Sequence, residues 1–225
     1  MGWKASTIII NKPAQVDHKK LLEELGFSKL AKIENEPFEI AINPDDNKVF
    51  IGTYKNNLLI CAPDIPMQFF EDSVTGVEKT LINHFPASEI CAIILHSGVN
   101  LWGYSVIKNG QKIRTRAGSS DDGTFIETGE PLEEEKQLLN KSTTGEDGTR
   151  TYIFEDMDEE PMTEDQVGEN FVFEIWSRYF GEQLDRADES LFETTLTGYS
   201  FEAIVQKTKQ QQQHTNDNKP WWKFW

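Results

Sequence analysis

Residues 90–117 read ICAIILHSGVNLWGYSVIKNGQKIRTRA, and this stretch decides the fold. Residues 90–95 form an apolar run that is typical of a strand covered on both faces, and its length favours a strand over a helix. Residues 101–108 then alternate as a strand does, and Asn109-Gly110 separates them from residues 111–117. Because both central residues of such a two-residue turn need positive φ, the Asn-Gly pair predicts a β-hairpin.

A two-residue turn also predicts which side chains share a face of this hairpin, because successive side chains of a strand point to opposite faces. The residues expected on the core face are Trp102, Tyr104, Val106, Ile113 and Thr115. The residues expected on the other face are Gly103, Ser105, Arg114 and Arg116. Two arginines opposite small residues would leave space above the sheet.

Two interpretations of Arg114 and Arg116 follow. In the first, they pair with the acidic residues that come soon after them, since arginine binds carboxylates with two parallel hydrogen bonds. These acidic residues are Asp121, Asp122, Glu127, Glu130 and Glu133 to Glu135. In the second, the arginines bind an anion or a carboxylate of a partner. The candidate binding residues in the domain are Arg114, Arg116, Ser105, Glu130 and His96.

His96 ends the buried strand and is followed by Ser97. Catalytic groups occur at such positions, but a histidine that is satisfied by hydrogen bonds at a strand end is the plainer interpretation. The sequence has no phosphate-binding loop, dinucleotide-binding glycine motif, zinc-protease motif or nucleophile elbow. No catalytic residue, metal ligand or cofactor is therefore assigned.

Composition limits the partners that this chain can bind. Its 225 residues carry a net charge of −16, which argues against nucleic acids and anionic membranes and permits a basic protein partner. The two cysteines, Cys61 and Cys91, lie in separate apolar runs without metal-binding spacing, so free thiols in a reducing compartment are expected. No signal-peptide pattern is present, and we expect a cytoplasmic protein.

The order of elements predicts one α+β domain over residues 1–205. We expect an antiparallel or mixed sheet with helices packed mainly on one face. The strongest helix pattern follows the capping-box spacing of Thr163 and Gln166 and continues to Phe180. Residues 38–42 alternate and are predicted to form a strand, whereas residues 199–205 fit either an edge strand or a helix.

Residues 206–225 are predicted to be a flexible polar linker with an aromatic end. Residues 207–218 are polar and include four consecutive glutamines. The aromatic residues of the end, which we include among the candidate binding residues, are Trp221, Trp222, Phe224 and Trp225. Three interpretations stay open: the end packs on the domain itself, docks on a partner protein, or anchors at a membrane interface.

The order of several short motifs resembles an uncharacterised bacterial family known only as a domain of unknown function. The most specific piece is the hairpin arginine Arg114 followed by the turn Gly129-Glu130-Pro131. The other matching pieces are Gly2 to Thr7, His96-Ser97, Gly103 to Val106, Ser119 to Gly123, Gly168 to Asn170, Tyr179 to Gly181 and Gly198 to Phe201. After Leu132 the chain departs from the family pattern. The resemblance implies no known activity.

We therefore expect a non-enzymatic cytoplasmic protein that binds another protein, with an immunity-type inhibitor of a basic toxin as one form of it. The alternative is a hydrolase or transferase with a site near His96, Arg114, Arg116 and Glu130. Clustering of these four side chains in one pocket would favour the enzyme. Pairing of the arginines with the acidic residues after them would favour the binding protein.

Overall fold

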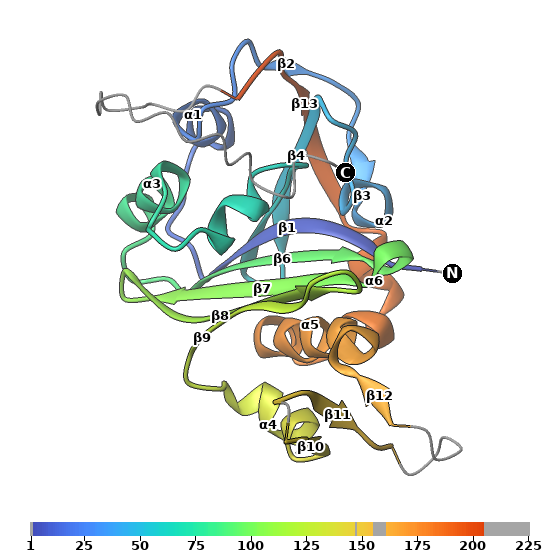
Figure 1. Ribbon diagram of the computed structural model, residues 1–225. Coiled ribbons are helices and arrows are strands. Elements are labelled where there is room, and N and C mark those ends of the chain that lie inside the picture. Colours follow the sequence, from blue (N-terminus) through green and yellow to red (C-terminus); the bar gives the residue numbers. More distant parts are fainter. Residues whose placement is uncertain (1, 147, 155–160, 205–225) are drawn as a thin grey trace.

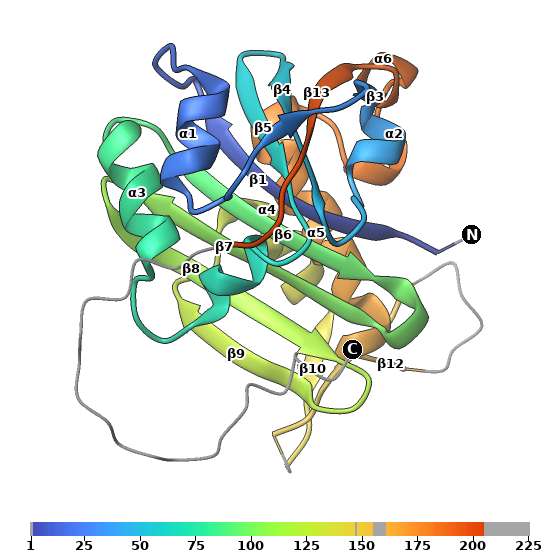
Figure 2. The ribbon, with the colours of Figure 1, turned by 90° about the horizontal axis from the view of Figure 1, so that it is seen from above.

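A long antiparallel sheet forms the centre of the molecule (Figures 1 and 2). The computed structural model describes residues 2–146, 148–154 and 161–204. The ten strands of the sheet run in the order β2-β13-β4-β5-β1-β6-β7-β8-β9, with β3 paired to β13. Their bounds are β1 (Lys4–Asn11), β2 (Ala31–Lys32), β3 (Glu36–Pro37), β4 (Lys48–Tyr54), β5 (Asn57–Cys61), β6 (Ile90–His96), β7 (Leu101–Lys108), β8 (Gln111–Ser119), β9 (Gly123–Gly129) and β13 (Thr195–Ser200).

Both faces of the sheet are covered by helices. In Figure 1, α1 (His18–Glu24) and α3 (Gly76–His84) lie above the sheet, and α4 (Glu133–Leu139) and α5 (Glu164–Phe180) lie below it. The short helices η1 (Pro66–Phe70), α2 (Phe38–Ala41) and α6 (Glu189–Phe192) complete the two layers. The α+β class and the antiparallel sheet agree with the sequence prediction, but the helices are not confined mainly to one face.

The central strands explain why two layers of helices are needed. In β1, Ile8 and Ile10 belong to the core that packs against α1 and α3, whereas Ile9 belongs to the core between the sheet and α5. All three side chains are fully buried. An uninterrupted apolar run buries both of its faces only if each face receives a cover.

The segment between the sheet and α5 forms a small subdomain. Its three-stranded sheet consists of β10 (Ser142–Thr144), β11 (Arg150–Tyr152) and β12 (Met162–Thr163), and it lies beside α4 and the start of α5. Tyr152 of β11 is fully buried and packs edge-on against Phe171 of α5. The subdomain is thus joined to the main core through α5.

Helix α5 begins and ends where its sequence predicts. Thr163 and Gln166 form the capping box, and Gly181 ends the helix with a φ of 79°. Gly168 lets the helix backbone approach the sheet closely, because a Cβ at this position would lie 2.0 Å from Cδ1 of Trp102. Trp102 is fully buried and stacks with Phe171, so this close contact is part of the core.

The hairpin of β7 and β8 follows the predicted register only next to its turn. Lys108 pairs with Gln111 and Ile107 with Lys112, as expected, but a bulge at Ile113 then shifts every later pair by one residue. Val106 lies opposite Arg114 rather than Ile113. The bulge therefore turns Arg114 and the residues after it to the opposite face from the one predicted.

The shifted register exchanges the environments of the hairpin side chains. Arg116 lies opposite Tyr104 and shares its face, which is the α5 face. Ser105 lies opposite Thr115 instead, and their hydroxyl oxygens are 2.8 Å apart on the other face. The predicted open space above the arginines is filled by α4, α5 and β11.

Residues 38–42 form helix α2 and the residue after it, not the predicted strand. Phe38, Ala41 and Ile42 are buried at helical spacing, while Ile40 is 56% exposed. The backbone N–H of Phe38 donates to the carbonyl of Thr194, which places the helix start beside β13.

Residues 199–205, for which an edge strand and a helix were both open, form neither as a whole. Tyr199 and Ser200 end β13, which lies between β2 and β4 and is not an edge strand. Residues 201–203 lie outside helices and strands, Ile204 forms an isolated bridge with Phe27, and residue 205 is outside the described residues.

Candidate functional site

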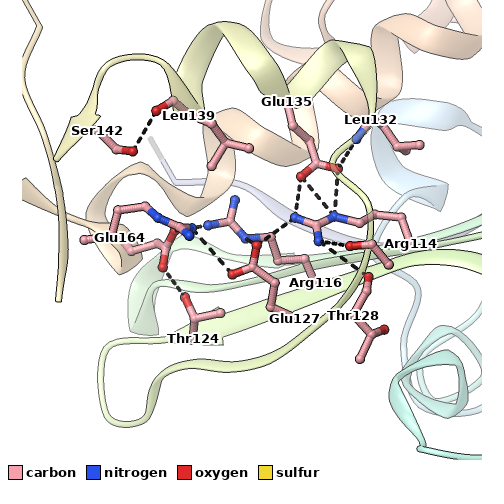
Figure 3. A network of polar contacts seen from close by, with 12 residues as sticks. Arg114, Arg116, Thr124, Glu127, Thr128, Leu132, Glu135, Leu139, Ser142 and Glu164 are labelled. Atoms are coloured by element: carbon pink, nitrogen blue, oxygen red, sulfur yellow. Dashed lines mark hydrogen bonds and ion pairs between the residues drawn. The ribbon is translucent and has the colours of Figure 1, made fainter. Parts of the chain in front are cut away.

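The first site candidate is the buried network around Arg114 and Arg116, shown in Figure 3. The Arg114 guanidinium donates through Nε to both carboxylate oxygens of Glu135 at 3.0 Å and through Nη2 to Oε2 at 2.6 Å. Arg114 Nη1 also donates to the carbonyl of Gly129 at 2.8 Å. Arg114 is 1% exposed and Glu135 is fully buried. This contact ties α4 to β8.

Glu135 reaches Arg114 because of the local structure at the start of α4. Its carboxylate accepts a hydrogen bond from the backbone N–H of Leu132 at 3.0 Å, which caps the helix. Gly129, with a φ of 79°, allows the chain to turn away from β9 directly before this cap. A Cβ at Gly129 would meet the backbone of Ile113 at the bulge, so glycine is required there.

Arg116 occupies the neighbouring half of the network. It donates to the carboxylate of Glu164, the first residue of α5, and lies over the ring of Phe171 with 4.2 Å between guanidinium carbon and ring centre. Glu164 also accepts hydrogen bonds from Thr124 and Tyr152, each at 2.6 Å. Arg116 thus joins β8 to α5 and to the small subdomain.

The charges of the network balance. Three arginines, Arg114, Arg116 and Arg150, face three glutamates, Glu127, Glu135 and Glu164. Glu127 contacts all three arginines. Burial by itself would raise the pKa of Glu127, but the charge of Arg116 and the contacts of the other two arginines outweigh it and lower this pKa.

The network leaves little room for a ligand. A charge-balanced group has no excess positive charge with which to attract an anion, and both hairpin arginines are closed off from solvent. The burial of Tyr104, next to Arg116 across the strand pair, raises the pKa of its hydroxyl well above the ordinary value. The geometry fits the interpretation in which the arginines pair within the chain.

The second site candidate is a pocket of about 440 Å³ beside η1, where His96 lies. Its acidic lining residues are Asp46, Asp64, Asp121 and Asp122. Its apolar lining includes Pro44, Pro63, Met67, Val99 and Leu101. No lysine or arginine is among the described residues that line it. The pocket therefore combines apolar surface with negative charge.

Three of these aspartates present their carboxylates without a cationic neighbour. Within the described ranges, Asp46, Asp121 and Asp122 form no ion pair, and all three residues are exposed. His96 is half-buried, and its Nδ1 atom is buried without a hydrogen-bond partner among the described residues. The neighbouring Ser97 is occupied elsewhere, since its hydroxyl donates to Glu169 at 2.7 Å.

The structure separates the residues that the sequence singled out. Arg114 and Arg116 belong to the buried network, Ser105 lies buried on the opposite face of the hairpin, and His96 lines the acidic pocket. Glu130 is exposed after β9, and neither arginine contacts it. The aromatic residues Trp221, Trp222, Phe224 and Trp225 lie outside the described residues.

The chain matches the profile of a family of unknown function, DUF6928, over residues 12–154. The match covers more than half of the 225 residues. The chain belongs to the DUF6928 family. The expected resemblance to a domain of unknown function is therefore confirmed, and membership of DUF6928 carries no known activity.

The DUF6928 match contains most of both site candidates. It includes Arg114, Arg116, Glu127 and Glu135, but it ends before Glu164 of α5. The comparisons with curated proteins and with solved structures gave no match. In the described part of the chain, no helix has the length and apolar character to cross a bilayer, and no group of three or more potential metal ligands occurs.

Part of each candidate site could be predicted from the sequence. Glu127 and residues 133–135 were among the acids expected to pair with the arginines, whereas Glu164, which is 48 residues from Arg116, was not. Asp121 and Asp122 were also expected beside the arginines and instead line the pocket with His96. The pocket is assembled from five separate segments, so no local sequence pattern predicts it.

Proposed function

We propose that the protein is a non-enzymatic module that binds a basic segment of another protein at the acidic pocket beside His96. The observation that carries the proposal is the lining of this pocket, with four aspartates, apolar side chains and no described cationic residue. A lysine or arginine of a partner suits such a surface, because its aliphatic stem packs on apolar atoms while its charged head meets carboxylates.

The size of the pocket supports a side-chain anchor. A volume of about 440 Å³ lies within the range of roughly 300–1,000 Å³ that is usual for ligand-binding pockets. The net charge of −16 adds a long-range attraction for a basic partner, which speeds association and depends on ionic strength. The interaction is therefore expected to weaken as salt concentration rises.

The state of the arginines also supports a binding role over an enzymatic one. A hydrolase or transferase site would need His96, Arg114, Arg116 and Glu130 around one pocket. Arg114 is instead paired with the buried Glu135 and Arg116 with the partly buried Glu164, and Glu130 is exposed without contact to either arginine. Two free cysteines, both fully buried, are compatible with a reducing compartment such as the cytoplasm.

An affinity capture with the full chain as bait tests the proposal. The pocket variant carries Asp46→Asn, Asp121→Asn and Asp122→Asn, three conservative changes at exposed positions. The control variant carries Glu39→Gln, Glu189→Gln and Glu193→Gln, which remove the same charge from exposed residues outside the pocket. Recovery of one partner by the wild type and the control, but not by the pocket variant, is expected. A partner retained equally by all three baits, or by none, would overturn the proposal.

A further inference from the structure

The C-terminal end of the chain carries positive charge and aromatic side chains, which complement the acidic pocket. Residues 205–225, outside the described residues, contain four lysines and one aspartate, a net charge of +3. The remaining 204 residues therefore carry −19 of the chain's total of −16. Lys223 stands between Trp222 and Phe224, so aromatic surface and positive charge occur side by side at the very end.

The pocket offers both complements to such a segment. Met67, Val99 and Leu101 supply apolar surface for an aromatic ring, and the surrounding aspartates supply negative charge for a lysine. Aromatic side chains contribute strongly to binding in pockets that exclude water. No described lysine or arginine lines the pocket to repel the segment or to pair with Asp46, Asp121 and Asp122 in its place.

The segment also starts close enough to reach the pocket. The backbone N–H of Phe201 donates to the carbonyl of Asn47 at 3.0 Å, and Asn47 directly follows the pocket residue Asp46. Sixteen residues separate Ile204 from Trp221. A flexible chain of this length has a root-mean-square span of about 20–24 Å, which exceeds the radius of gyration of about 17 Å expected for a 204-residue domain.

Because the segment is tethered to the domain, even a weak contact would give substantial occupancy of the pocket. A short flexible linker gives its end an effective concentration in the millimolar range. A segment that binds the pocket with a dissociation constant of about 1 mM would then occupy it for a large part of the time. Strong intrinsic affinity is not required for self-occupancy.

We infer that residues 219–225 bind the acidic pocket of their own molecule, with tryptophan or phenylalanine on the apolar surface and Lys223 or Lys219 at the aspartates. The segment thereby competes with the basic partner segment for one surface. The contact itself does not depend on any partner, whereas its regulatory consequence rests on the proposed function.

Paramagnetic relaxation in the full chain tests the contact. A nitroxide is attached to Ser120→Cys, an exposed position between the pocket residues Ser119 and Asp121, and the tryptophan indoles are labelled with ¹⁵N. Cys61 and Cys91 are fully buried, so the label reacts with the new cysteine. The matched control carries the label at Glu193→Cys, an exposed position that does not line the pocket.

The contact predicts strong broadening of the indole signals of Trp221, Trp222 and Trp225 by the label at position 120 and weak broadening by the label at position 193. The broadening should persist on dilution and should be lost when Asp46→Asn, Asp121→Asn and Asp122→Asn are introduced. Equal broadening from both labels, broadening that fades on dilution because a second copy supplies the segment, or broadening that survives the three substitutions would each overturn the inference.

A second measurement separates this inference from the proposed function. Deletion of residues 219–225 is expected to strengthen partner binding several-fold, because a competitor is removed. If the partner depends on the three aspartates but its affinity is unchanged by the deletion, the proposed function stands and self-competition is contradicted. If the paramagnetic contact is present but no partner depends on the aspartates, the contact stands and the proposed function fails.

Discussion

The guanidinium of Arg114 and the carboxylate of Glu135 form a buried two-pronged ion pair that fastens α4 to the central sheet. Both groups are buried, so the role of this ion pair is structural. Its neighbour Arg116 does the same for α5 through Glu164. Arg114 and Arg116 therefore hold α4, α5 and the small subdomain in place beside the sheet.

Breaking this pair should destabilise the protein strongly. Glu135→Ala leaves Arg114 buried without its main partner, and such a change costs about 3–5 kcal/mol of unfolding free energy. Urea denaturation followed by circular dichroism measures the loss. The control is Glu133→Ala on the same helix, whose side chain is 81% exposed and whose loss should stay within about 0.5 kcal/mol.

Replacing both partners distinguishes the loss of the ion pair from the cost of leaving one buried charge unpaired. The double variant Arg114→Met, Glu135→Leu removes both charges together, and apolar replacement of a buried ion pair is often close to neutral. We expect the double variant to be more stable than Glu135→Ala alone. The two groups would act independently if the double variant lost as much unfolding free energy as the single variants Arg114→Met and Glu135→Leu lose together.

Stability should fall in acid because of the glutamates that face arginine. The pKa values of Glu127 and Glu89 are lowered in the folded protein, despite burial, by Arg116 and by Arg178 respectively. Their stabilising contribution is complete above the unfolded glutamate pKa of about 4.3 and is lost as pH falls through the lower folded values. Urea titrations from pH 6 to pH 3 should show this decline.

The variant Glu127→Gln identifies the source of that acid sensitivity. It removes one titrating group, so the unfolding free energy should depend less steeply on pH below about 4.3 than in the wild type. Glu130→Gln serves as the control, since Glu130 is exposed and contacts neither arginine. If the unfolding free energies of Glu127→Gln and the wild type depended equally on pH, Glu127 would not be a source of the acid sensitivity.

Gly168 is expected to resist substitution although it lies inside a helix. Alanine favours a helix by about 1 kcal/mol over glycine, but its Cβ would lie 2.0 Å from Trp102. Overpacking of a core costs about 1–3 kcal/mol, so Gly168→Ala should lower the midpoint of thermal unfolding. Gly76→Ala in α3, where the Cβ meets nothing within 4 Å, should leave the midpoint unchanged or raise it.

Both cysteines should be inert in the native protein. Burial raises the pKa of Cys61 to about 12 and that of Cys91 further still, and the thiolate is the reactive form. A thiol-specific chromogenic reagent should therefore react with neither residue until urea unfolds the chain, and with both afterwards. Fast reaction of one thiol in native buffer would show that its strand opens locally.

In the hairpin of β7 and β8, the turn could be predicted from the sequence but the bulge could not. Asn109-Gly110 placed the turn correctly, and the pairs next to it are as expected. The bulge at Ile113 was hidden, because an isoleucine fits a regular strand as well as a bulge. The shifted register places Arg114 against Glu135 of α4 and Arg116 against Glu164 of α5, which are 21 and 48 residues away along the chain.

The same limit applies to helix α2 and to the pocket. Residues 38–42 alternate like a strand, but contacts with β13 and α5 select the helix that buries Phe38 and Ala41. The acidic pocket gathers aspartates from three loops around the end of β6. Their convergence is a property of the sheet topology and has no signature in any one stretch of sequence.

The affinity of the captured partner for the pocket variant tests the central claim most directly. Titration calorimetry would compare the wild type, the variant Asp46→Asn, Asp121→Asn, Asp122→Asn and the charge-matched variant Glu39→Gln, Glu189→Gln, Glu193→Gln. For the pocket variant we predict a dissociation constant at least tenfold higher than that of the wild type, a loss of about 1.4 kcal/mol of binding free energy. For the control we predict at most a twofold change in the dissociation constant. Equal weakening of both variants would show that net charge alone attracts the partner and would contradict a binding site at His96.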